Sequence, residues 1–319
     1  MDRVRVIGAG VIGLTTAVCL AETGVDVEVV SDRRPGATTS AAAGAMWDPY
    51  FVEPADQVER WSRVTLSVLS GLSADPASGV RLVEGTQQSS LARELPSWGP
   101  LVGARPCLPG ELRPGYVTGW HYRAPLVDMP RYLDHLMGRL LRAGGRLRYH
   151  RHADLDEATD GTARVVVNCT GTGARALAAD PLVEAVRGQL VVVENPGIGS
   201  FFCDDTPGAP LTYVYPQTDT VVLGGTAEPG NWDLEYDEEA ARRILSRCTA
   251  VEPLLKGARV LGHRVGLRPA RPRIRLEPEP YGDTVVVHNY GHGGAGLTVS
   301  WGCAHEAAEQ ARRALRFTP

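Results

Sequence analysis

The feature that most constrains the fold is a glycine motif near the start of the chain, Gly8-x-Gly10-x-x-Gly13. It follows a short β-branched run at residues 3–7 and opens a pattern in which apolar residues recur at helical spacing up to residue 21. In such a motif the first glycine allows a sharp turn, the second leaves room for a pyrophosphate, and the third lets the helix pack closely on the strand. The free N–H groups at the helix N-terminus also favour phosphate. The motif therefore predicts a dinucleotide-binding domain.

The run "VDVEVVSD" completes this unit as a second strand that ends at Asp32, 19 residues after Gly13. Strand, turn, helix and strand together span about thirty residues, the size of a βαβ module. At the end of the second strand, the Asp32 carboxylate can accept hydrogen bonds from a ribose hydroxyl. Arg33 and Arg34 could instead hold a 2′-phosphate, but Asp32 would repel that phosphate. NAD, NADP and FAD all stay open from this motif, and Arg33 is expected at the surface or beside the adenine.

Helices and strands alternate along the rest of the chain. Sequence patterns predict helices at 56–72, 129–145, 238–253 and 297–315, and strands at 146–150, 163–171, 188–195, 220–226 and 283–291. Residues 33–45 and the Pro- and Gly-rich stretch between 73 and 128 are expected to form loops. The polar strand end "NCTG" and the last strand and helix are typical of returns to the nucleotide domain. Such interleaving favours FAD, a long cofactor that crosses its domain in extended form.

We therefore predict an α/β fold with two interleaved domains. A Rossmann-like FAD-binding domain comprises residues 1–45, 150–190 and 255–319, and a mixed-sheet α+β substrate domain comprises residues 46–149 and 191–254. The flavin ring should lie where the two domains meet, because ligand pockets form preferentially at such interfaces.

Composition argues against several other classes of protein. The net charge is −4 and no basic cluster is present, so nucleic acid and acidic membrane surfaces are not expected as partners. The longest apolar runs have strand length, which predicts no membrane span. None of the six cysteines forms a C-x-x-C pair, so we expect no metal site. The chain enters its first strand directly, without a signal peptide, and the cytoplasm is the expected location.

A second glycine-rich segment, "VVHNYGHGGAGLTVSWGCA" (286–304), lies near the other end of the chain. Together with "VIGAGVIGLTTA" (6–17), "AAGAMWDPY" (42–50), "VVNCTG" (166–171), "VVLGGT" and "GNW" (221–232) and "GLRPARPRIRLE" (266–277), it makes the chain resemble the D-amino-acid oxidases. This FAD-dependent family also contains D-aspartate oxidase. The resemblance implies FAD as the cofactor, a D-amino acid and oxygen as small-molecule partners, and a homodimer as a candidate assembly. The implied reaction transfers a hydride from the substrate Cα to flavin N5 and gives a 2-oxo acid, ammonia and hydrogen peroxide.

The resemblance also implies roles for individual residues. Arg268 corresponds to a clamp for the substrate carboxylate, since a guanidinium presents two parallel donors that a lysine lacks. Tyr213 corresponds to a tyrosine whose hydroxyl reaches the same carboxylate, and Tyr215, two residues further on, is expected to shape the side-chain pocket. The backbone carbonyl of Gly294 corresponds to the acceptor for the substrate amine. His292, among these glycines, is expected to be structural and not a catalytic base.

The expected cofactor contacts lie at strand ends, in glycine-rich turns or at the starts of helices. They are Gly8, Gly10, Val11, Ile12, Gly13, Asp32, Arg33, Thr38, Thr39, Ser40, Ala43, Gly44, Thr170, Gly171, Gly293, Gly294, Gly296, Leu297 and Thr298. The glycine turn before the last helix should place N–H groups by the flavin ring, where the positive helix end stabilises the negative charge of reduced flavin.

The substrate class is less constrained by these residues. Mammalian-type members carry a second tyrosine on a mobile lid where this chain has Ala209, which predicts a shorter lid and an open pocket. Aspartate-specific members carry two arginines where this chain has Thr206 and Ala227, so an acidic side chain would have no charge partner. We therefore expect neutral D-amino acids as substrates. The alternatives are D-aspartate oxidase, a glycine or sarcosine oxidase, and a flavoprotein that binds without turnover.

Overall fold

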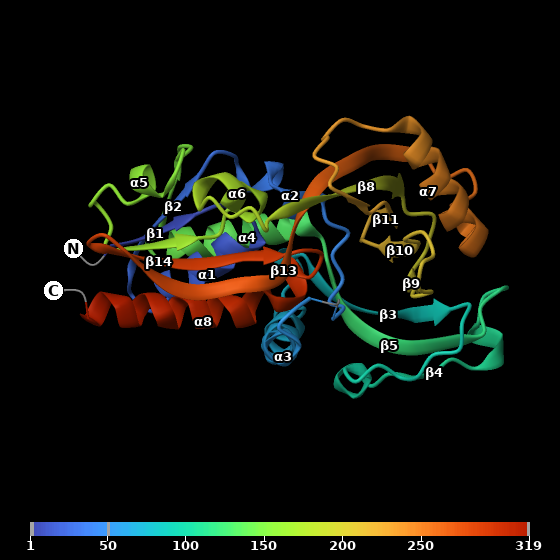
Figure 1. Ribbon diagram of the computed structural model, residues 1–319. Coiled ribbons are helices and arrows are strands. Elements are labelled where there is room, and N and C mark those ends of the chain that lie inside the picture. The colour runs from blue at the N-terminus through green and yellow to red at the C-terminus, as the bar shows by residue number, and fades with distance from the viewer. Residues whose placement is uncertain (1–2, 50–51, 318–319) are drawn as a thin grey trace.

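The computed structural model describes residues 3–49 and 52–317, and within them one continuous β-sheet runs the length of the molecule (Figure 1). Its strands are β1 (Arg3–Ile7), β2 (Asp26–Ser31), β3 (Val80–Ser89), β4 (Arg105–Pro106), β5 (Thr118–Val127), β6 (Arg146–Tyr149), β7 (Val165–Asn168), β8 (Glu184–Glu194), β9 (Phe201–Asp204), β10 (Tyr213–Pro216), β11 (Thr220–Gly224), β12 (Glu228–Pro229), β13 (Val260–Tyr281) and β14 (Thr284–His292). The helices are α1 (Val11–Ala21), α2 (Thr39–Ala42), α3 (Ala55–Leu72), α4 (Met129–Arg142), α5 (Leu155–Ala158), α6 (Ala174–Leu177), α7 (Glu238–Val251) and α8 (Gly296–Phe317). Tyr50 and the outermost residues of the predicted cofactor domain lie outside the described residues.

The glycine motif belongs to the parallel part of the sheet. Strands β6, β2, β1, β7 and β14 lie side by side in parallel. Side chains of α1, α4 and α8 share one apolar core with β1, β2 and β7, while α5 and α6 contribute to a smaller core that contains residues of β1, β7 and β14. The central strands β7 and β14 are therefore buried on both faces, which explains the runs of valine at 165–167 and 285–287.

The long strand β13 joins this part of the sheet to an antiparallel part. Residues 260–270 of β13 pair with β8, and residues 270–281 pair with β14, with a shift of register between Ala270 and Arg275. Beyond β8 the sheet continues through β11, β10, β9, β3, β5 and β4, and α7 packs on β8, β10 and β11 (Figure 1). One strand thus belongs to both parts and fixes their relative position.

The predicted α/β fold with a mixed sheet is confirmed, and so are the strand, motif, helix and strand of the first unit. The loop prediction for residues 73–128 was wrong, because β3 and β5 lie there as two paired antiparallel strands. Glycine at position 85 weakens the strand pattern of β3, yet it is needed: an added Cβ would lie 2.2 Å from the backbone oxygen of Phe201 on β9. Residues 35–37 and 39–42 also form short helical turns within the segment predicted as a loop.

Three elements that were predicted for the substrate domain pack instead on the parallel part. Strand β6 pairs with β2, and Leu133, Leu136 and Leu140 of α4 share the core of α1. Helix α3 packs along α8. This grouping could not be predicted, because the pattern of an amphipathic helix shows that it has a buried face and not which element that face meets.

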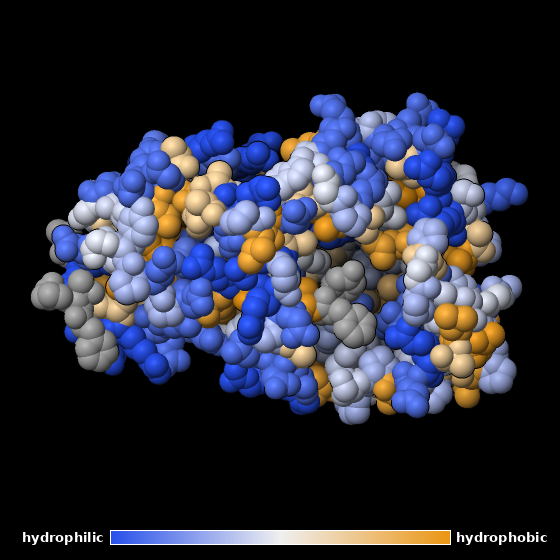
Figure 2. Space-filling model, in the orientation of Figure 1, coloured by the Kyte–Doolittle hydropathy of each residue, from blue (hydrophilic) through white to orange (hydrophobic). Residues whose placement is uncertain are grey.

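In the described part of the chain, no helix is both long and apolar enough to cross a bilayer. The face of the molecule in Figure 2 is mostly hydrophilic with small hydrophobic patches, and it is hollowed near the junction of the two parts of the sheet.

The contact of α3 with α8 depends on a glycine, and this gives a first prediction. A Cβ on Gly302 would lie 2.2 Å from the Cα of Trp61, whereas a Cβ on Gly71, an exposed position in α3, meets nothing within 4 Å. We expect Gly302→Ala to lower the free energy of unfolding by about 2 kcal/mol through overpacking. The control Gly71→Ala should raise it by about 1 kcal/mol, because alanine favours the helix. Urea unfolding of both variants measures this, and two effects of the same sign would contradict the packing argument.

Candidate functional site

The glycine motif forms a tight turn between β1 and α1. Gly8 has a φ of +108°, and an added Cβ would lie 2.4 Å from the carbonyl oxygen of Cys169. A Cβ on Gly13 would lie 1.9 Å from the oxygen of Gly8. The backbone is therefore left bare where α1 begins, and the N–H groups of its first turn, including that of Ile12, have no acceptor within the helix. Together these features fit a bound pyrophosphate.

The short α2 segment lies against this turn. The Ser40 Oγ accepts a hydrogen bond of 2.9 Å from the Val11 N–H, and it would lie 3.0 Å from a Cβ on Gly10. The Thr38 Oγ1 is the next hydroxyl beside Gly10, at 3.9 Å from the same position. Thr39 contacts Gly266 of β13. The structure therefore places residues 38–40 between the glycine turn and β13, as a cofactor spanning both would require.

The end of β7 adds a second turn beside β13. The Thr170 N–H and Oγ1 both donate to Oδ1 of Asn168, the latter at 2.7 Å. Gly171 has a φ of +58°, and an added Cβ would lie 3.7 Å from Cγ of Pro269. Asp32 and Arg33 follow the carboxyl end of β2, where their side chains are about half exposed and lie 3.5 Å apart. The residues that follow β1, β2 and β7 therefore lie together at the carboxyl ends of the parallel strands, where the Gly8 N–H donates to the Val30 carbonyl of β2.

Arg268 is held by backbone alone. Its guanidinium lies over Gly188 of β8, where an added Cβ would lie 2.5 Å from Nη1. Nη1 donates a 3.0 Å hydrogen bond to the carbonyl of Thr226. Among the described residues, no carboxylate forms an ion pair with Arg268, although the side chain is only partly exposed. An unpaired guanidinium in such a place is suited to bind a carboxylate ligand.

The two predicted tyrosines lie next to this arginine. The rings of Tyr213 and Tyr215 stack with centroids 4.4 Å apart. The Tyr213 ring covers Gly224, and its hydroxyl would lie 3.1 Å from a Cβ on Gly44. Burial raises the pKa of Tyr213 well above 10, and the charge of Arg268 only partly opposes this. The hydroxyl therefore keeps its proton and can donate a hydrogen bond.

The second glycine-rich segment forms the turn from β14 into α8. Gly291 and Gly293 have φ values of +85° and +53°, and the Gly293 N–H donates to the Pro269 carbonyl at 2.8 Å, directly beside Arg268. Gly294 follows in this turn, and Gly296 begins α8. Burial lowers the pKa of His292 to about 3, so its imidazole stays neutral, which agrees with a structural role.

Two of the predicted contacts are restricted to their backbone atoms. The Leu297 and Ala43 side chains pack in the core around α1, so only their N–H and C=O groups could meet a cofactor. The Thr298 Oγ1 donates to the Asp48 carbonyl at 2.9 Å and accepts from the Asp48 N–H at 3.2 Å. Its hydroxyl therefore ties α8 to the segment that precedes α3.

Asp48 is a site residue that sequence reasoning missed. Burial, followed by the charge of Asp205, raises the pKa of its carboxyl to about 7. Its charge in turn raises the pKa of Tyr215 and of Cys203, so it lies near the stacked tyrosines. The segment "AAGAMWDPY" contains it, but nothing local distinguishes a buried aspartate from an exposed one.

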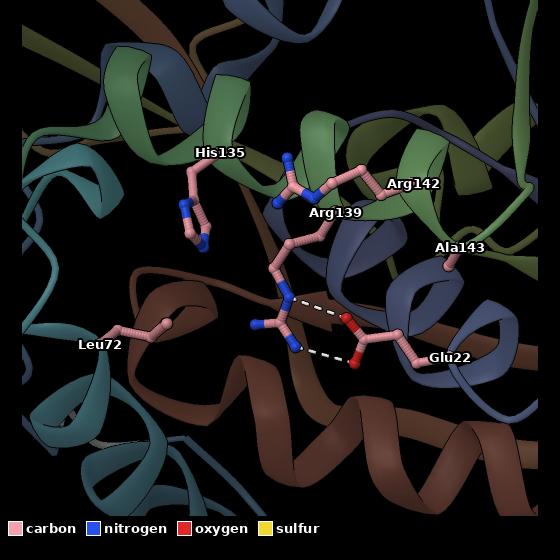
Figure 3. Close-up of a pocket in the computed structure, with 6 residues that line it drawn as sticks. All are labelled: Glu22, Leu72, His135, Arg139, Arg142 and Ala143. Atoms are coloured by element: carbon pink, nitrogen blue, oxygen red, sulfur yellow. Dashed lines mark hydrogen bonds and ion pairs between the residues drawn. The ribbon is translucent and has the colours of Figure 1, made fainter.

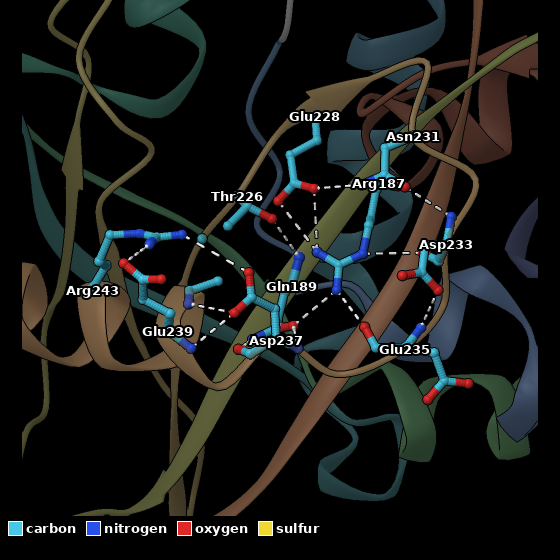
Figure 4. A network of polar contacts seen from close by, with 12 residues as sticks. Arg187, Gln189, Thr226, Glu228, Asn231, Asp233, Glu235, Asp237, Glu239 and Arg243 are labelled. Atoms are coloured by element: carbon cyan, nitrogen blue, oxygen red, sulfur yellow. Dashed lines mark hydrogen bonds and ion pairs between the residues drawn. The ribbon is translucent and has the colours of Figure 1, made fainter.

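A buried polar network behind Arg268 was also missed (Figure 4). Arg187 on β8 is only 2% exposed and donates to the Gln189 side chain, to Glu228 and to the carbonyls of Asp233 and Glu235. The available signal in the sequence was a charged and an amide side chain, Arg187 and Gln189, which stand two residues apart among the apolar residues of "EAVRGQLVVVE".

Gln189 extends this network to the segment that Arg268 contacts. The Gln189 N–H donates to the Thr226 Oγ1 at 2.9 Å, and the Gln189 carbonyl accepts from the Thr226 N–H at 3.2 Å. The Gln189 side chain bonds both the N–H and the carbonyl of Asp237. Residues 226–237 are thus fastened to β8 at both ends, and the Thr226 carbonyl faces Arg268.

A surface pocket of about 570 Å³ lies elsewhere, on α4 (Figure 3). It is lined by Glu22, Leu72, His135, Arg139, Arg142 and Ala143, and Arg139 donates to both carboxylate oxygens of Glu22. Glu22 follows the C-terminal end of α1, about 16 Å along the helix from the glycine turn. The pocket contains none of the predicted site residues, so it is not the site described above.

Comparison with known proteins agrees with this geometry. The family model described as FAD dependent oxidoreductase matches residues 3–310. The D-amino-acid oxidase of Rubrobacter xylanophilus is 50% identical over 318 residues, which cover 98% of this chain and 97% of that protein. The D-aspartate oxidase of Homo sapiens is 41% identical over 322 residues, covering 96% and 93%. The crystal structure of glycine oxidase from Geobacillus kaustophilus matches 98% of this chain and 95% of its own with a TM-score of 0.82, and at 20% identity it shows a common fold.

The predicted family and its FAD dependence are thereby confirmed. Because the family model and both relatives extend over almost the whole chain, the protein belongs to the FAD-dependent oxidoreductase family that includes the D-amino-acid oxidases.

Proposed function

We propose that this protein is a D-amino-acid oxidase that converts neutral D-amino acids to 2-oxo acids, with release of ammonia and hydrogen peroxide. The observation that carries the proposal is the partly buried Arg268 guanidinium, which has no acidic partner among the described residues and lies beside the protonated Tyr213 hydroxyl. A carboxylate, whose oxygens can accept hydrogen bonds from both groups, is the ligand that such a pair recognises.

The residues present fit FAD. The bare turn at Gly8–Gly13 would hold the pyrophosphate and Asp32 the ribose, while the turns at Thr170–Gly171 and Gly293–Gly296 would face the flavin. Adding a Cβ to Gly8 or Gly13 would bring it within 2.4 Å of backbone oxygen, so the bare backbone is required there. When bound, FAD supplies the acceptor for a hydride and passes the electrons on to oxygen.

The protein's own contribution is to orient the substrate. Arg268 would take the carboxylate through two parallel N–H donors, and the Tyr213 hydroxyl would donate to the same group. The Gly294 carbonyl would accept a hydrogen bond from the amine. Three fixed contacts determine which face of the Cα is presented, and positioning of this kind needs no catalytic acid or base. The low pKa of His292 agrees with this absence of a base.

The proposal extends to the domains, the setting and the partners of the protein. We assign the FAD-binding domain to the parallel part of the sheet with α1, α3, α4 and α8, and the substrate domain to the antiparallel part with α7. The expected setting is the cytoplasm, with a homodimer as the candidate assembly, small molecules as partners and neither nucleic acid nor membrane.

A neutral substrate is favoured over D-aspartate by the charges near the tyrosines. The two positions that carry arginine in aspartate-specific members are Thr206 and Ala227, and the Thr206 Oγ1 is already used to accept from the Ser90 N–H at 2.9 Å. Asp48 adds a carboxyl close to Tyr215. D-aspartate oxidase stays the second candidate because the human enzyme is 41% identical over nearly the whole chain.

The oxidase proposal predicts a stereospecific reduction of the flavin. Without oxygen, D-valine should bleach the visible flavin band and L-valine should not. Arg268→Met should weaken the response to D-valine by roughly 100-fold or more, because a buried charge-assisted contact is lost. The control Arg273→Met removes an exposed arginine from the same strand and should leave the titration unchanged. Equal bleaching by both isomers would refute the assignment.

The Arg187 network predicts an effect on substrate binding at a distance. In Arg187→Lys one ammonium cannot reach the four acceptors of the guanidinium, so the segment 226–237 and the Thr226 carbonyl should loosen. We expect KM for D-valine to rise by about five-fold or more, with kcat changed less, in steady-state oxygen consumption. The control Arg243→Lys alters an exposed ion pair at the end of the same network. Loss of thermal stability with an unchanged KM would show that Arg187 acts on folding alone.

Asp48 predicts a pH-dependent preference between substrates. With a pKa of about 7, its carboxyl is charged at pH 8 and mostly neutral at pH 6. A charged Asp48 should repel D-aspartate and leave D-valine unaffected. The ratio of kcat/KM for D-valine to that for D-aspartate should therefore fall roughly five-fold from pH 8 to pH 6, as expected for about 1 kcal/mol of repulsion. In Asp48→Asn the ratio should be the same at both values, and an unchanged pH dependence in that variant would exclude Asp48 as its source.

A further inference from the structure

Two histidines and a glutamate meet at the outer edge of the parallel sheet. His150 follows β6, the strand at the edge of the sheet, and its backbone N–H donates to the Ser31 carbonyl of β2 at 3.0 Å. His152 is the next but one residue, and Glu157 lies in α5. Five strand spacings, about 24 Å, separate β6 from β13, so this cluster is not part of the substrate site.

The three side chains present their ligand atoms to one another. Nε2 of His150 lies 2.7 Å from Oε1 of Glu157, and Nδ1 of His152 lies 3.9 Å from the same oxygen. One ligand atom from each residue falls within 4.8 Å of the others. In a tetrahedral zinc site with bonds of about 2.0–2.1 Å, ligand atoms are about 3.4 Å apart. The observed distances lie on both sides of this value, so small side-chain rotations would satisfy it.

His152 is the strongest single sign of a ligand. Its side chain is 2% exposed, and neither ring nitrogen has a hydrogen-bond partner among the described residues. A buried polar group without a partner costs about 1–3 kcal/mol. A metal ion at this point would bond one of these nitrogens and remove part of that cost.

The carboxylate is already oriented for such a role. Oε2 of Glu157 accepts a 2.7 Å hydrogen bond from the Ala153 N–H, which leaves Oε1 turned toward both histidines. The Asp154 side chain accepts from the Glu157 N–H at 2.9 Å and fixes the start of α5. Hydrogen bonds of this kind, one shell behind the ligands, hold them in place in known metal sites.

The surrounding charges do not oppose a cation strongly. Arg5 is paired with Glu28 and Asp160, and Arg148 is paired with Glu28.

We propose that His150, His152 and Glu157 form a binding site for a divalent transition metal, with Zn²⁺ as the best match. Two imidazoles and one carboxylate are ligands that zinc prefers, and a water would complete the tetrahedron. Bound there, the ion ties the loop after β6 to α5. The prediction of no metal site rested on the spacing of the cysteines, which says nothing about a site made of histidine and carboxylate ligands.

The test is zinc binding by the full-length flavoprotein, purified without a histidine tag. Calorimetric titration with ZnCl₂ should show one saturable site. His150→Ala and Glu157→Gln should each weaken binding by about ten-fold or more. The matched control Asp156→Asn changes a neighbouring carboxylate of α5 that is not a ligand, and its affinity should equal that of the wild type. The His150 and Glu157 side chains are about 40% exposed, so both variants should fold.

Absence of saturable binding would overturn the proposal, and so would equal affinity in the His150→Ala variant. Equal weakening in Asp156→Asn would also overturn it, because it would indicate general attraction to acidic groups. Binding is read directly as heat and flavin absorbance is recorded in parallel, so the result does not depend on oxidase activity.

Discussion

The continuous pairing of β13 with both β8 and β14 is the constraint on which the rest of the site depends. Because one strand belongs to both parts of the sheet, a residue near its middle has a fixed position relative to each part. Arg268 is such a residue: it lies over Gly188 of β8, while its neighbour Pro269 accepts the hydrogen bond from the Gly293 turn. The clamp and the turn that should face the flavin are therefore held by the same piece of backbone. Separate domains joined by a linker would leave their distance free to vary.

Glycine serves two physical purposes in this protein. At Gly10 it is expected to leave room for a ligand, whereas at Gly8 and Gly13 it lets segments of backbone approach closely, and at Gly188 and Gly224 it makes room for the side chains of Arg268 and Tyr213. At Gly302 it lets two helices touch, far from any cofactor contact. A glycine-rich motif in the sequence therefore mixes binding positions with packing positions, and only the neighbours of each one separate the two.

The parts of the fold that could be predicted are those encoded locally. The strand, turn and helix around Gly8, and the amphipathic helices α3, α4, α7 and α8, each carry their own pattern within about twenty residues. Arg268 and Tyr213 were found through a family resemblance. The partner of each element could not be predicted. For this reason β3 and β5 were read as loops, and the packing of α4 against α1 was not expected. Asp48 and the Arg187 network escaped for the same reason: their roles depend on contacts with residues about 40 to 160 positions away in the sequence.

Within the described part of the chain Arg268 has no acidic partner, and this has an energetic meaning that unites these features. A partly buried guanidinium without a counterion is unfavourable, and the protein offsets that cost only in part, through the single Thr226 carbonyl. That carbonyl is itself held by Gln189, whose position depends on Arg187. The buried Arg187 donates to four acceptors, whereas Arg268 donates to the Thr226 carbonyl and has no carboxylate partner among the described residues. A carboxylate that entered the site would meet a donor that folding has already partly buried and oriented, so more of the interaction energy would be available for holding a substrate in one orientation.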